Sequence, residues 1–266
     1  MIKMIATDID GTILKYNYEF NQPVIDCIKN LSAHNIPVVL VTGRMHGAAK
    51  IVADKLDLKT PIISYQGGLI KDGDKVLYEK IIDPATAKKI INWGKSNNIH
   101  LQVYINDNLY VEHDNDTIKR YILQSGLPYI TGSFDNLDLN GVNKILAIDY
   151  NDSEKVSRWV EYLQHEYPDL YIVKSTPYFC EISNKEATKA CALEYLRNLW
   201  GLKKEEIMTI GDQNNDIVLL KAGGLAVAMG NATDELKACA DYVTDTIDND
   251  GFVKAVEKFV LVKATD

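Results

Sequence analysis

The sequence predicts an α/β protein, built as a Rossmann-like parallel sheet flanked by helices, with a smaller α+β domain inserted into it. Three observations indicate this class. Strand and helix patterns alternate from the N-terminus to about residue 65, as is typical of a parallel sheet wound with helices. Strand patterns then follow one another directly through the middle of the chain, and the alternation returns after about residue 187. We therefore predict a core of residues 1–83 and 187–266, interrupted by a cap domain of residues 84–186.

The first part of the core contains three strand patterns and two helix patterns. The run over residues 36–41 is continuous, apolar and rich in β-branched side chains, which favours a strand buried on both faces. Pro23 stands where the first turn of a helix tolerates proline. We expect strands over residues 2–8, 36–41 and 61–65, a helix that begins near Pro23, and a helix over residues 48–56.

The cap and the second part of the core have different patterns. In the cap, two strand patterns flank Asn106-Asp107-Asn108, which predicts an antiparallel hairpin. We expect cap helices over residues 84–96, 116–124 and 153–166, and cap strands over residues 101–105, 109–113, 144–150, 170–175 and 178–182. In the second part of the core we expect a helix over residues 188–199 and strands over residues 206–212, 225–229 and 242–244.

The composition is that of a compact, mildly acidic protein. The 266 residues include 29 Lys and Arg and 37 Asp and Glu, which gives a formal net charge of -8. The sequence contains no basic tract, so we do not expect nucleic acid as a partner. The apolar runs are far shorter than the roughly 20 residues of a membrane helix. The N-terminus has no signal-peptide pattern, and the four cysteines are scattered. We expect a cytoplasmic protein without a membrane partner, present as a monomer or small homo-oligomer.

The first candidate site motif is Asp8-Ile9-Asp10-Gly11-Thr12, at the carboxyl end of the first predicted strand. Ligands bind at this edge of open α/β sheets. Alternation along a strand would place Asp8 and Asp10 on one side. A calcium loop also begins with Asp-x-Asp-Gly, but Glu19 lies one position before the place where an EF-hand needs its last ligand. Calcium is therefore disfavoured.

A second acidic cluster, Gly211-Asp212-Gln213-Asn214-Asn215-Asp216, follows another predicted strand. By itself it could be an ordinary helix N-cap. Together with Asp8 and Asp10, however, it would gather carboxylates at one sheet edge, where they repel one another unless a cation neutralises them. Mg²⁺ accepts carboxylate and carbonyl oxygens. The sequence therefore predicts a magnesium site.

Two further positions suit an anionic substrate. Thr42 follows the second strand, and with Gly43 it offers a hydroxyl and a backbone N–H to a phosphoryl oxygen. Lys189 lies near the start of the predicted helix that leads back into the core, and Lys185 is close by. A helical lysine is usually a solvated surface charge, and chemistry alone does not choose between the two.

Together, Asp8-Ile-Asp-Gly-Thr, Val41-Thr-Gly-Arg, Lys189 and Gly211-Asp-Gln-Asn-Asn-Asp resemble the four ordered motifs of the haloacid dehalogenase superfamily. The chain is most similar to the Cof-type sugar-phosphatase branch, over its whole length. The third motif of that family is a lysine followed by a small residue and an Ala-Leu helix. This resemblance selects Lys189 over Lys185.

The resemblance implies a Mg²⁺-dependent phosphatase of small phosphorylated metabolites, either sugar phosphates or phosphorylated cofactors. Asp8 would be the nucleophile that forms an aspartyl-phosphate, and Asp10 the general acid and then base. A further set of residues would bind the phosphoryl group: Thr42, Gly43, Lys189 and Asn215. The metal would be held by the Asp8 carboxylate, the Asp10 backbone carbonyl and Asp212, with Asn215 and Asp216 supporting that shell.

Two departures from the family pattern bear on substrate choice. Gln66-Gly67-Gly68 stands where the branch usually has Asn-Gly-Ala, and Ala190 replaces a common glycine after the motif lysine. A longer amide at position 66 could change which substrate oxygen is recognised. Equally, Gly67-Gly68 could simply mark a turn at the end of a strand.

Two rival functions share part of this residue set. A phosphomutase would need a phosphorylated enzyme shielded from water, for which the sequence gives no sign. A receiver-like switch also places acidic residues, a threonine and a lysine around a phosphorylated aspartate. It has no use for an inserted cap of this size or for the acid/base group that Asp10 would provide. Both features favour turnover.

Overall fold

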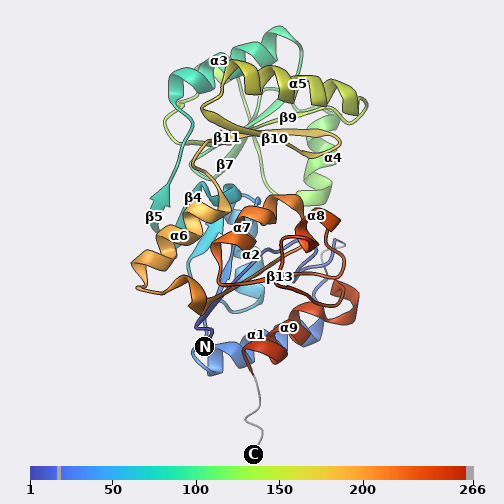
Figure 1. Ribbon diagram of the computed structural model, residues 1–266. Helices are drawn as coiled ribbons and strands as arrows, with labels where there is room; N and C mark the ends of the chain where they lie inside the picture. The colour runs from blue at the N-terminus through green and yellow to red at the C-terminus, as the bar shows by residue number, and fades with distance from the viewer. Residues whose placement is uncertain (17–18, 262–266) are drawn as a thin grey trace, which may run out of the picture. The chain divides into compact units, whose positions relative to one another are not determined.

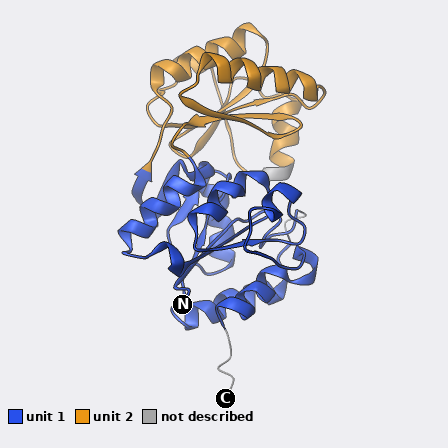
Figure 2. Cartoon of the chain, viewed as in Figure 1, with its two compact units in different colours: residues 1–78, 188–266 blue, residues 79–187 orange. Residues whose placement is uncertain are grey.

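The chain folds into two compact units, seen in the computed structural model, which describes residues 1–16 and 19–261. Unit 1 comprises residues 1–78 and 188–266, and unit 2 comprises residues 79–187 (Figure 2). Unit 2 thus begins five residues before the predicted cap and ends one residue after it. The earlier start has a local cause, because Glu79 accepts a hydrogen bond from Asn143 Nδ2 at 3.0 Å and Ile82 N–H donates to Val142 O at 2.8 Å, both within unit 2.

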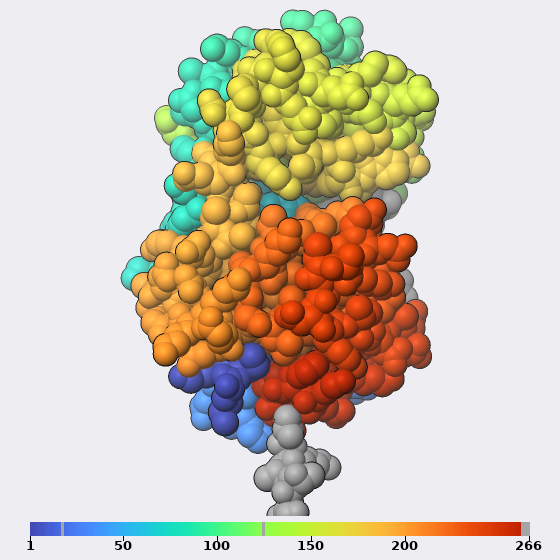
Figure 3. All heavy atoms as spheres, viewed as in Figure 1, coloured from blue at the N-terminus to red at the C-terminus, as the bar shows by residue number. Residues whose placement is uncertain are grey.

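The centre of unit 1 is a five-stranded parallel sheet (Figure 1). Its strands, in spatial order, are β14 (Tyr242–Val243), β13 (Leu225–Ala228), β12 (Ile207–Gly211), β1 (Met4–Thr7) and β2 (Val38–Leu40). Strands β1, β2 and β12 are buried along their whole length, as their unbroken apolar sequences predict. The parallel pairing of β1 with β12 joins the two parts of unit 1. The blue N-terminal residues accordingly lie against the orange and red C-terminal part of the chain (Figure 3).

Helices cover both faces of this sheet. On one face α1 (Gln22–Ala33), α2 (His46–Lys55) and α9 (Gly251–Phe259) pack against side chains such as Ile5. On the other face α6 (Lys189–Leu199) and α7 (Ile217–Ala222) pack against Met4 and Ala6. Because successive strand residues point to opposite faces, β1 contributes to both cores. A further short helix is α8 (Asp234–Lys237).

The third predicted strand of the core is only partly as expected. Strand β3 (Ile62–Ser64) meets the parallel sheet through a single bridge, between Val41 and Ile63. It otherwise pairs antiparallel with β4 (Leu69–Asp72), which is followed by β5 (Lys75–Glu79) in a separate three-stranded sheet. The sequence analysis did not predict β4, β5 or α9.

Unit 2 is an α+β domain, as predicted. Its sheet has the order β10-β11-β9-β6-β7-β8, with antiparallel pairs except between β7 and β8. The strands are β6 (His100–Ile105), β7 (Asn108–Val111), β8 (Ile130–Thr131), β9 (Val142–Ile148), β10 (Leu170–Thr176) and β11 (Phe179–Asn184). The helices are α3 (Pro84–Ser96), α4 (Asp116–Ser125) and α5 (Ser153–Glu166). Apolar side chains of α3 and α5 form one core with the sheet.

Across residues 1–16 and 19–261, no helix combines the length and the apolar character needed to cross a bilayer.

Candidate active site

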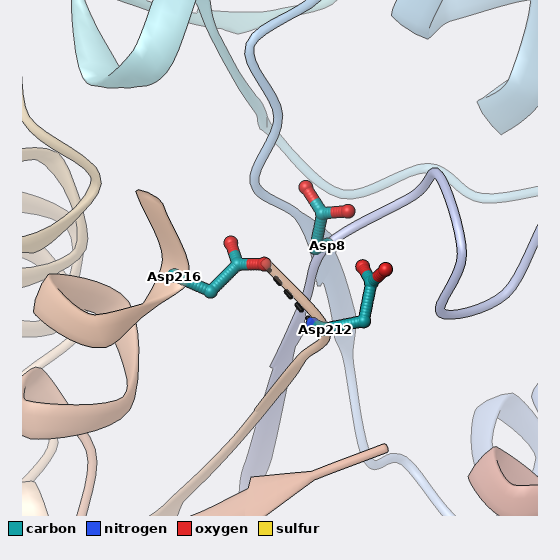
Figure 4. A group of neighbouring side chains, drawn as sticks. All are labelled: Asp8, Asp212 and Asp216. Carbon is teal, nitrogen blue, oxygen red and sulfur yellow. Dashed lines mark hydrogen bonds between the residues drawn. The ribbon is translucent and has the colours of Figure 1, made fainter. Parts of the chain in front are cut away.

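The site lies where the parallel strands of unit 1 end. Asp8 follows β1 and Asp212 follows β12, and the two strands are neighbours in parallel register. The Asp8 N–H donates to Ile210 O at 3.0 Å, which fixes the Asp8 backbone against the end of β12. The carboxyl groups of Asp8 and Asp212 therefore lie beside each other, with that of Asp216 across from them (Figure 4).

A buried lysine connects two of these carboxylates. Lys189, the first residue of α6, is 1% exposed, and its Nζ lies 2.6 Å from Asp8 Oδ1 and 2.5 Å from Asp216 Oδ1. Thr188 caps α6 by accepting a hydrogen bond from Cys191 N–H. By contrast, Lys185 is exposed and contacts Pro168 O and Asp169 in unit 2. The structure therefore brings Lys189, and not Lys185, to the carboxylates.

Burial and charge shift the pKa values of this group in opposite ways. Burial raises the pKa of Asp8 well above its ordinary value, Lys189 opposes this, and the carboxylate of Asp216 adds to it. Burial by itself would lower the pKa of Lys189, but Asp216 and Asp8 outweigh it, so this pKa is raised. Lys189 thus stays an ammonium, and its charge favours the ionised carboxylates beside it.

Asp212 is held by three side chains. Its Oδ1 accepts from Thr12 Oγ1 at 3.2 Å, and its Oδ2 accepts from Tyr16 OH at 2.6 Å and Gln213 Nε2 at 2.9 Å. Burial raises the pKa of Asp212, and the hydrogen bonds from Tyr16 and Gln213 oppose that rise. These donors fix the direction in which the carboxylate points.

Asp216 accepts hydrogen bonds from the backbone of the loop that carries Asp212. Its Oδ2 accepts the N–H groups of Asp212 and Gln213, each at 3.1 Å (Figure 4 shows the first of these), while its Oδ1 meets Lys189. Both oxygens of Asp216 are therefore engaged. Asp216 shapes the loop that carries Asp212.

Asp10 is directed elsewhere. Its carboxylate forms a two-pronged ion pair with Arg44, from Nε to Oδ2 at 2.8 Å and from Nη2 to Oδ1 at 2.5 Å. The side chain of Asp10 is 36% exposed, against 9% for Asp8. Arg44 follows Thr42-Gly43 directly, so the loop after β2 holds Asp10 in place.

The predicted phosphate-binding residues lie on adjoining loops. Thr42 is buried, and its Oγ1 accepts the N–H of Arg44 at 3.2 Å, which leaves the hydroxyl hydrogen able to donate. A Cβ on Gly43 would lie 2.5 Å from Gln66 Nε2. Asn215 Nδ2 donates to Gln66 Oε1 at 3.2 Å.

The group of Asp8, Asp212 and Asp216 fits a divalent cation. All three are buried, and one oxygen of each lies within 4.8 Å of the others. Lys189 can neutralise only one of the three negative charges, and the charge of Asp216 adds to the rise that burial causes in the pKa of Asp8 and of Asp212. A small divalent ion with oxygen ligands would neutralise the remaining charge.

The structure thus assembles most of the predicted site residues in unit 1. Asp8 and Asp216 both contact Lys189, and Asp212 adjoins them. Asp10 follows β1 with Asp8, Asn215 follows β12 with Asp212 and Asp216, and Thr42 follows β2. The side chain of Asp10 pairs with Arg44 rather than with the acidic group.

The sequence analysis did not assign roles to four residues of the site: Thr12, Tyr16, Arg44 and Gln213. Thr12 and Arg44 stand inside the motifs at the ends of β1 and β2, so their position was a usable signal. No spacing rule pointed to Tyr16, which reaches Asp212 across 196 positions of the chain.

The chain matches the family of haloacid dehalogenase-like hydrolases over residues 5–256. It is 30% identical to phosphatase YwpJ of Bacillus subtilis, across 94% of this chain and 97% of that protein. It is 28% identical to 5-amino-6-(5-phospho-D-ribitylamino)uracil phosphatase YwtE of the same organism, across 97% and 98%. Among solved structures, TM0651 from Thermotoga maritima is 34% identical, with a TM-score of 0.87 over 100% of this chain and 99% of that chain.

These matches extend across the core, the inserted cap and every loop that carries an acidic residue of the site. The fold, the motif order and the family therefore agree, and the resemblance inferred from the motifs is confirmed. The chain belongs to the haloacid dehalogenase-like hydrolases, in their Cof-type branch, and is a phosphatase of that type, a phosphoric monoester hydrolase.

Proposed function

We propose that the protein is a Mg²⁺-dependent phosphatase of small phosphorylated metabolites, such as sugar phosphates or phosphorylated cofactors, and that it works through an aspartyl-phosphate on Asp8. The observation that carries this proposal is the buried contact of Lys189 with Asp8 and Asp216, beside Asp212. This contact brings together a carboxylate that can act as nucleophile, the ammonium of Lys189 and an acidic metal-binding group, at the edge of the sheet where ligands bind.

In the first step, an oxygen of Asp8 attacks phosphorus while the bond from phosphorus to the ester oxygen breaks. Asp10 donates a proton to the departing oxygen. Lys189, Thr42 and the Gly43 N–H would bind the phosphoryl oxygens, with Asn215 at the same end of the site. In the second step, water attacks phosphorus, Asp10 takes its proton, and the bond to Asp8 breaks to release inorganic phosphate.

Asp10 must change partners for this reaction. Both of its oxygens contact Arg44 in the structure. One of these bonds has to give way to the leaving-group oxygen when substrate arrives. The carboxylate also has to take up a proton from solvent before it can act as the acid; it passes that proton to the ester oxygen and regains one from the attacking water. The pair with Arg44 therefore describes the resting position of the acid/base group.

Mg²⁺ would be held by the Asp8 carboxylate, the Asp10 backbone carbonyl and Asp212, and when bound it supplies positive charge that stabilises the transferring phosphoryl group. Asp216 would support this set from its place on the loop. The oxygens of Asp8, Asp212 and Asp216 within 4.8 Å of one another support the assignment.

The substrate class is supported by chemistry and by one relative. The site provides donors for a phosphate monoester and a general acid for its leaving group, which suits many small esters. YwtE acts on a phosphorylated ribitylamino-uracil, as its name states. We therefore include that compound among the substrates to be tested.

The test is inorganic phosphate release from sugar phosphates, nucleotides, pyridoxal phosphate, flavin mononucleotide and 5-amino-6-(5-phospho-D-ribitylamino)uracil, with Mg²⁺ or EDTA. Asp8→Asn should lower turnover by about 1000-fold or more, and Asp74→Asn, an exposed aspartate in the same unit, should not. Absence of release from every ester would overturn the proposal. Phosphate transfer within the substrate would indicate a mutase, and a stable phosphorylated Asp8 without turnover would indicate a switch.

A further inference from the structure

The turn after β3 has an unusual backbone and carries a glutamine that the proposed reaction does not use. Tyr65 and Gln66 have φ values of 52° and 58°, and Gly67 has a φ of 101°. Consecutive non-glycine residues in the left-handed region are costly, and they persist where surrounding contacts hold them. Such a turn is a reason to examine what its side chains do.

Contacts from two sides hold this turn. The Tyr65 N–H donates to Arg44 O at 2.9 Å, and the Gln66 N–H donates to Thr42 O at 3.0 Å. On the opposite side, a Cβ on Gly67 would lie 2.1 Å from Thr188 O, directly before the start of α6. The turn is thus fixed between the loop of Thr42 and the helix that begins with Lys189.

The side chain of Gln66 points into the site. Gln66 is 7% exposed, and its Oε1 accepts a hydrogen bond from Asn215 Nδ2 at 3.2 Å. Its Nε2 lies over Gly43, 2.5 Å from the place of a Cβ there. Across residues 1–16 and 19–261 this amino group has no hydrogen-bond acceptor. The amino group is not among the side-chain atoms that are sealed from solvent without a partner, so it can reach a ligand beside the proposed phosphate-binding residues.

We propose that Gln66 is a further substrate-binding residue, whose Nε2 donates a hydrogen bond to a phosphoryl oxygen of the ester. The inference rests on the proposed phosphatase function and extends its binding site. A phosphoryl oxygen is the expected acceptor because Nε2 lies over Gly43, whose N–H binds the same group in the proposal. Asn215 then acts through Gln66, because its own amide holds the Gln66 Oε1 and so directs Nε2.

In this proposal the site binds phosphate through the neutral amide of Gln66 as well as through the ammonium of Lys189. A neutral amide adds a directed hydrogen bond without adding charge to a site that also has to bind a metal. In this chain the longer glutamine reaches Gly43 from the turn at residues 65–67. Shortening it should withdraw the donor while leaving the turn intact.

Two variants separate substrate binding from a purely structural role. Gln66→Glu keeps the length and an oxygen for Asn215, but it replaces the donor by a negative charge. Gln66→Asn keeps an amide and suits the left-handed backbone, but it is one methylene shorter. Gln22→Glu, at an exposed position of α1, is the control for the added charge.

The measurements are the Kd of inorganic phosphate in the presence of Mg²⁺, by calorimetry, the KM of p-nitrophenyl phosphate, and the melting temperature. We expect Gln66→Glu to raise both constants at least tenfold and Gln66→Asn to raise them several-fold, with melting temperatures close to that of the wild type. Gln22→Glu, which loses a hydrogen bond to Asp26, should leave the Kd and the KM unchanged.

The outcomes distinguish this inference from the proposed function. If the wild type hydrolyses no ester and binds no phosphate, the proposed function fails and the inference fails with it. If the wild type is active but both Gln66 variants bind phosphate normally, the inference alone is overturned. A rise in KM without any change in the Kd of phosphate would also overturn it, because the donor would then contact the leaving group.

Discussion

Lys189 has two negatively charged neighbours and almost no contact with solvent, so its removal leaves buried charges without a partner. We expect Lys189→Met to lower the free energy of unfolding by about 3–5 kcal/mol, the usual cost of breaking a buried ion pair. Urea denaturation of the metal-free protein measures this directly. The same variant should lose phosphatase activity.

Lys185→Met is the matched control, because Lys185 is a nearby exposed lysine. Its effect on the free energy of unfolding should stay within about 0.5 kcal/mol. Equal destabilisation by the two variants would contradict the assignment of Lys189 as the lysine of the site.

Arg44 holds Asp10 with two parallel hydrogen bonds, and this geometry depends on the guanidinium group. Arg44→Lys keeps the charge but loses the second bond, so Asp10 should sample positions away from the leaving group. We expect kcat to fall about 10- to 100-fold, as misplaced catalytic groups commonly cause, while KM changes little. Steady-state kinetics decides this, and a rise in KM at unchanged kcat would show that Arg44 binds substrate instead.

At the scale of secondary structure elements, the turn of residues 65–67 allows a clean comparison of two glycines. Gly67 and Gly73 both have positive φ, but a Cβ would meet Thr188 O at 2.1 Å on Gly67 and nothing within 4 Å on Gly73. Gly73→Ala should cost about 1 kcal/mol, the price of the left-handed backbone. Gly67→Ala should cost clearly more, because the backbone of α6 has to move. Urea denaturation of both variants tests this, and equal losses would contradict the close contact.

Elements with strong local signals could be predicted from the sequence, and elements that depend on pairing could not. The predicted bounds of α3 and α5 agree with the structure, because Asp83 and Asp152 cap them and an apolar stripe continues to their ends. Strand β3 looked like another parallel strand since it is short and buried. Gly67-Gly68 signalled the turn that follows β3, but the short run of residues 69–72 did not reveal that the chain returns as the antiparallel strand β4.

The residues of the site divide in the same way: those that a motif marks could be predicted, and those that only a side-chain contact defines could not. Asp8, Asp212 and Lys189 could be predicted because acidic residues at strand ends and a motif lysine are visible along the chain. The pairs of Asp10 with Arg44 and of Asp212 with Tyr16 could not, since they join loops through side-chain geometry that no spacing encodes. Sequence reasoning thus indicated which loops carry the candidate site residues, while the direction of each carboxylate required the structure.

At the scale of the whole molecule, the two units should respond differently to acid. His100 in unit 2 accepts a hydrogen bond at Nδ1 from Asn115 Nδ2, and burial lowers its pKa from 6.5 to about 4. The unfolded chain therefore binds a proton below pH 6.5 that the folded unit does not bind until about pH 4. Stability from this group is complete above about pH 6.5 and is lost as the pH falls toward 4, by up to about 3 kcal/mol.

His100→Gln should make unit 2 less sensitive to acid over this range, although it also loses some packing. Hydrogen exchange of the β6 and β9 amides between pH 4 and 6.5 reports the stability of unit 2 specifically. His165→Gln, an exposed histidine of the same unit, should leave the pH dependence unchanged. An unaltered acid response in His100→Gln would mean that other groups cause it.

Metal binding should affect unit 1 and not unit 2, because the carboxylates of Asp8, Asp212 and Asp216 all lie in unit 1. A ligand that binds only the folded unit stabilises it, by about 2.7 kcal/mol at 100 times its Kd. We expect Mg²⁺ to slow hydrogen exchange of the β1 and β12 amides and to leave β6 and β9 unchanged. Since burial raises the pKa of Asp8 and of Asp212, protons compete with the metal, and the effect of Mg²⁺ on unit 1 should weaken as the pH falls.

Asp212→Asn should abolish this effect of Mg²⁺ on unit 1. Asp169→Asn, at an exposed residue of unit 2, should not. Equal protection of both units would show that the cation acts on the protein as general ionic strength and that the acidic group is not its site.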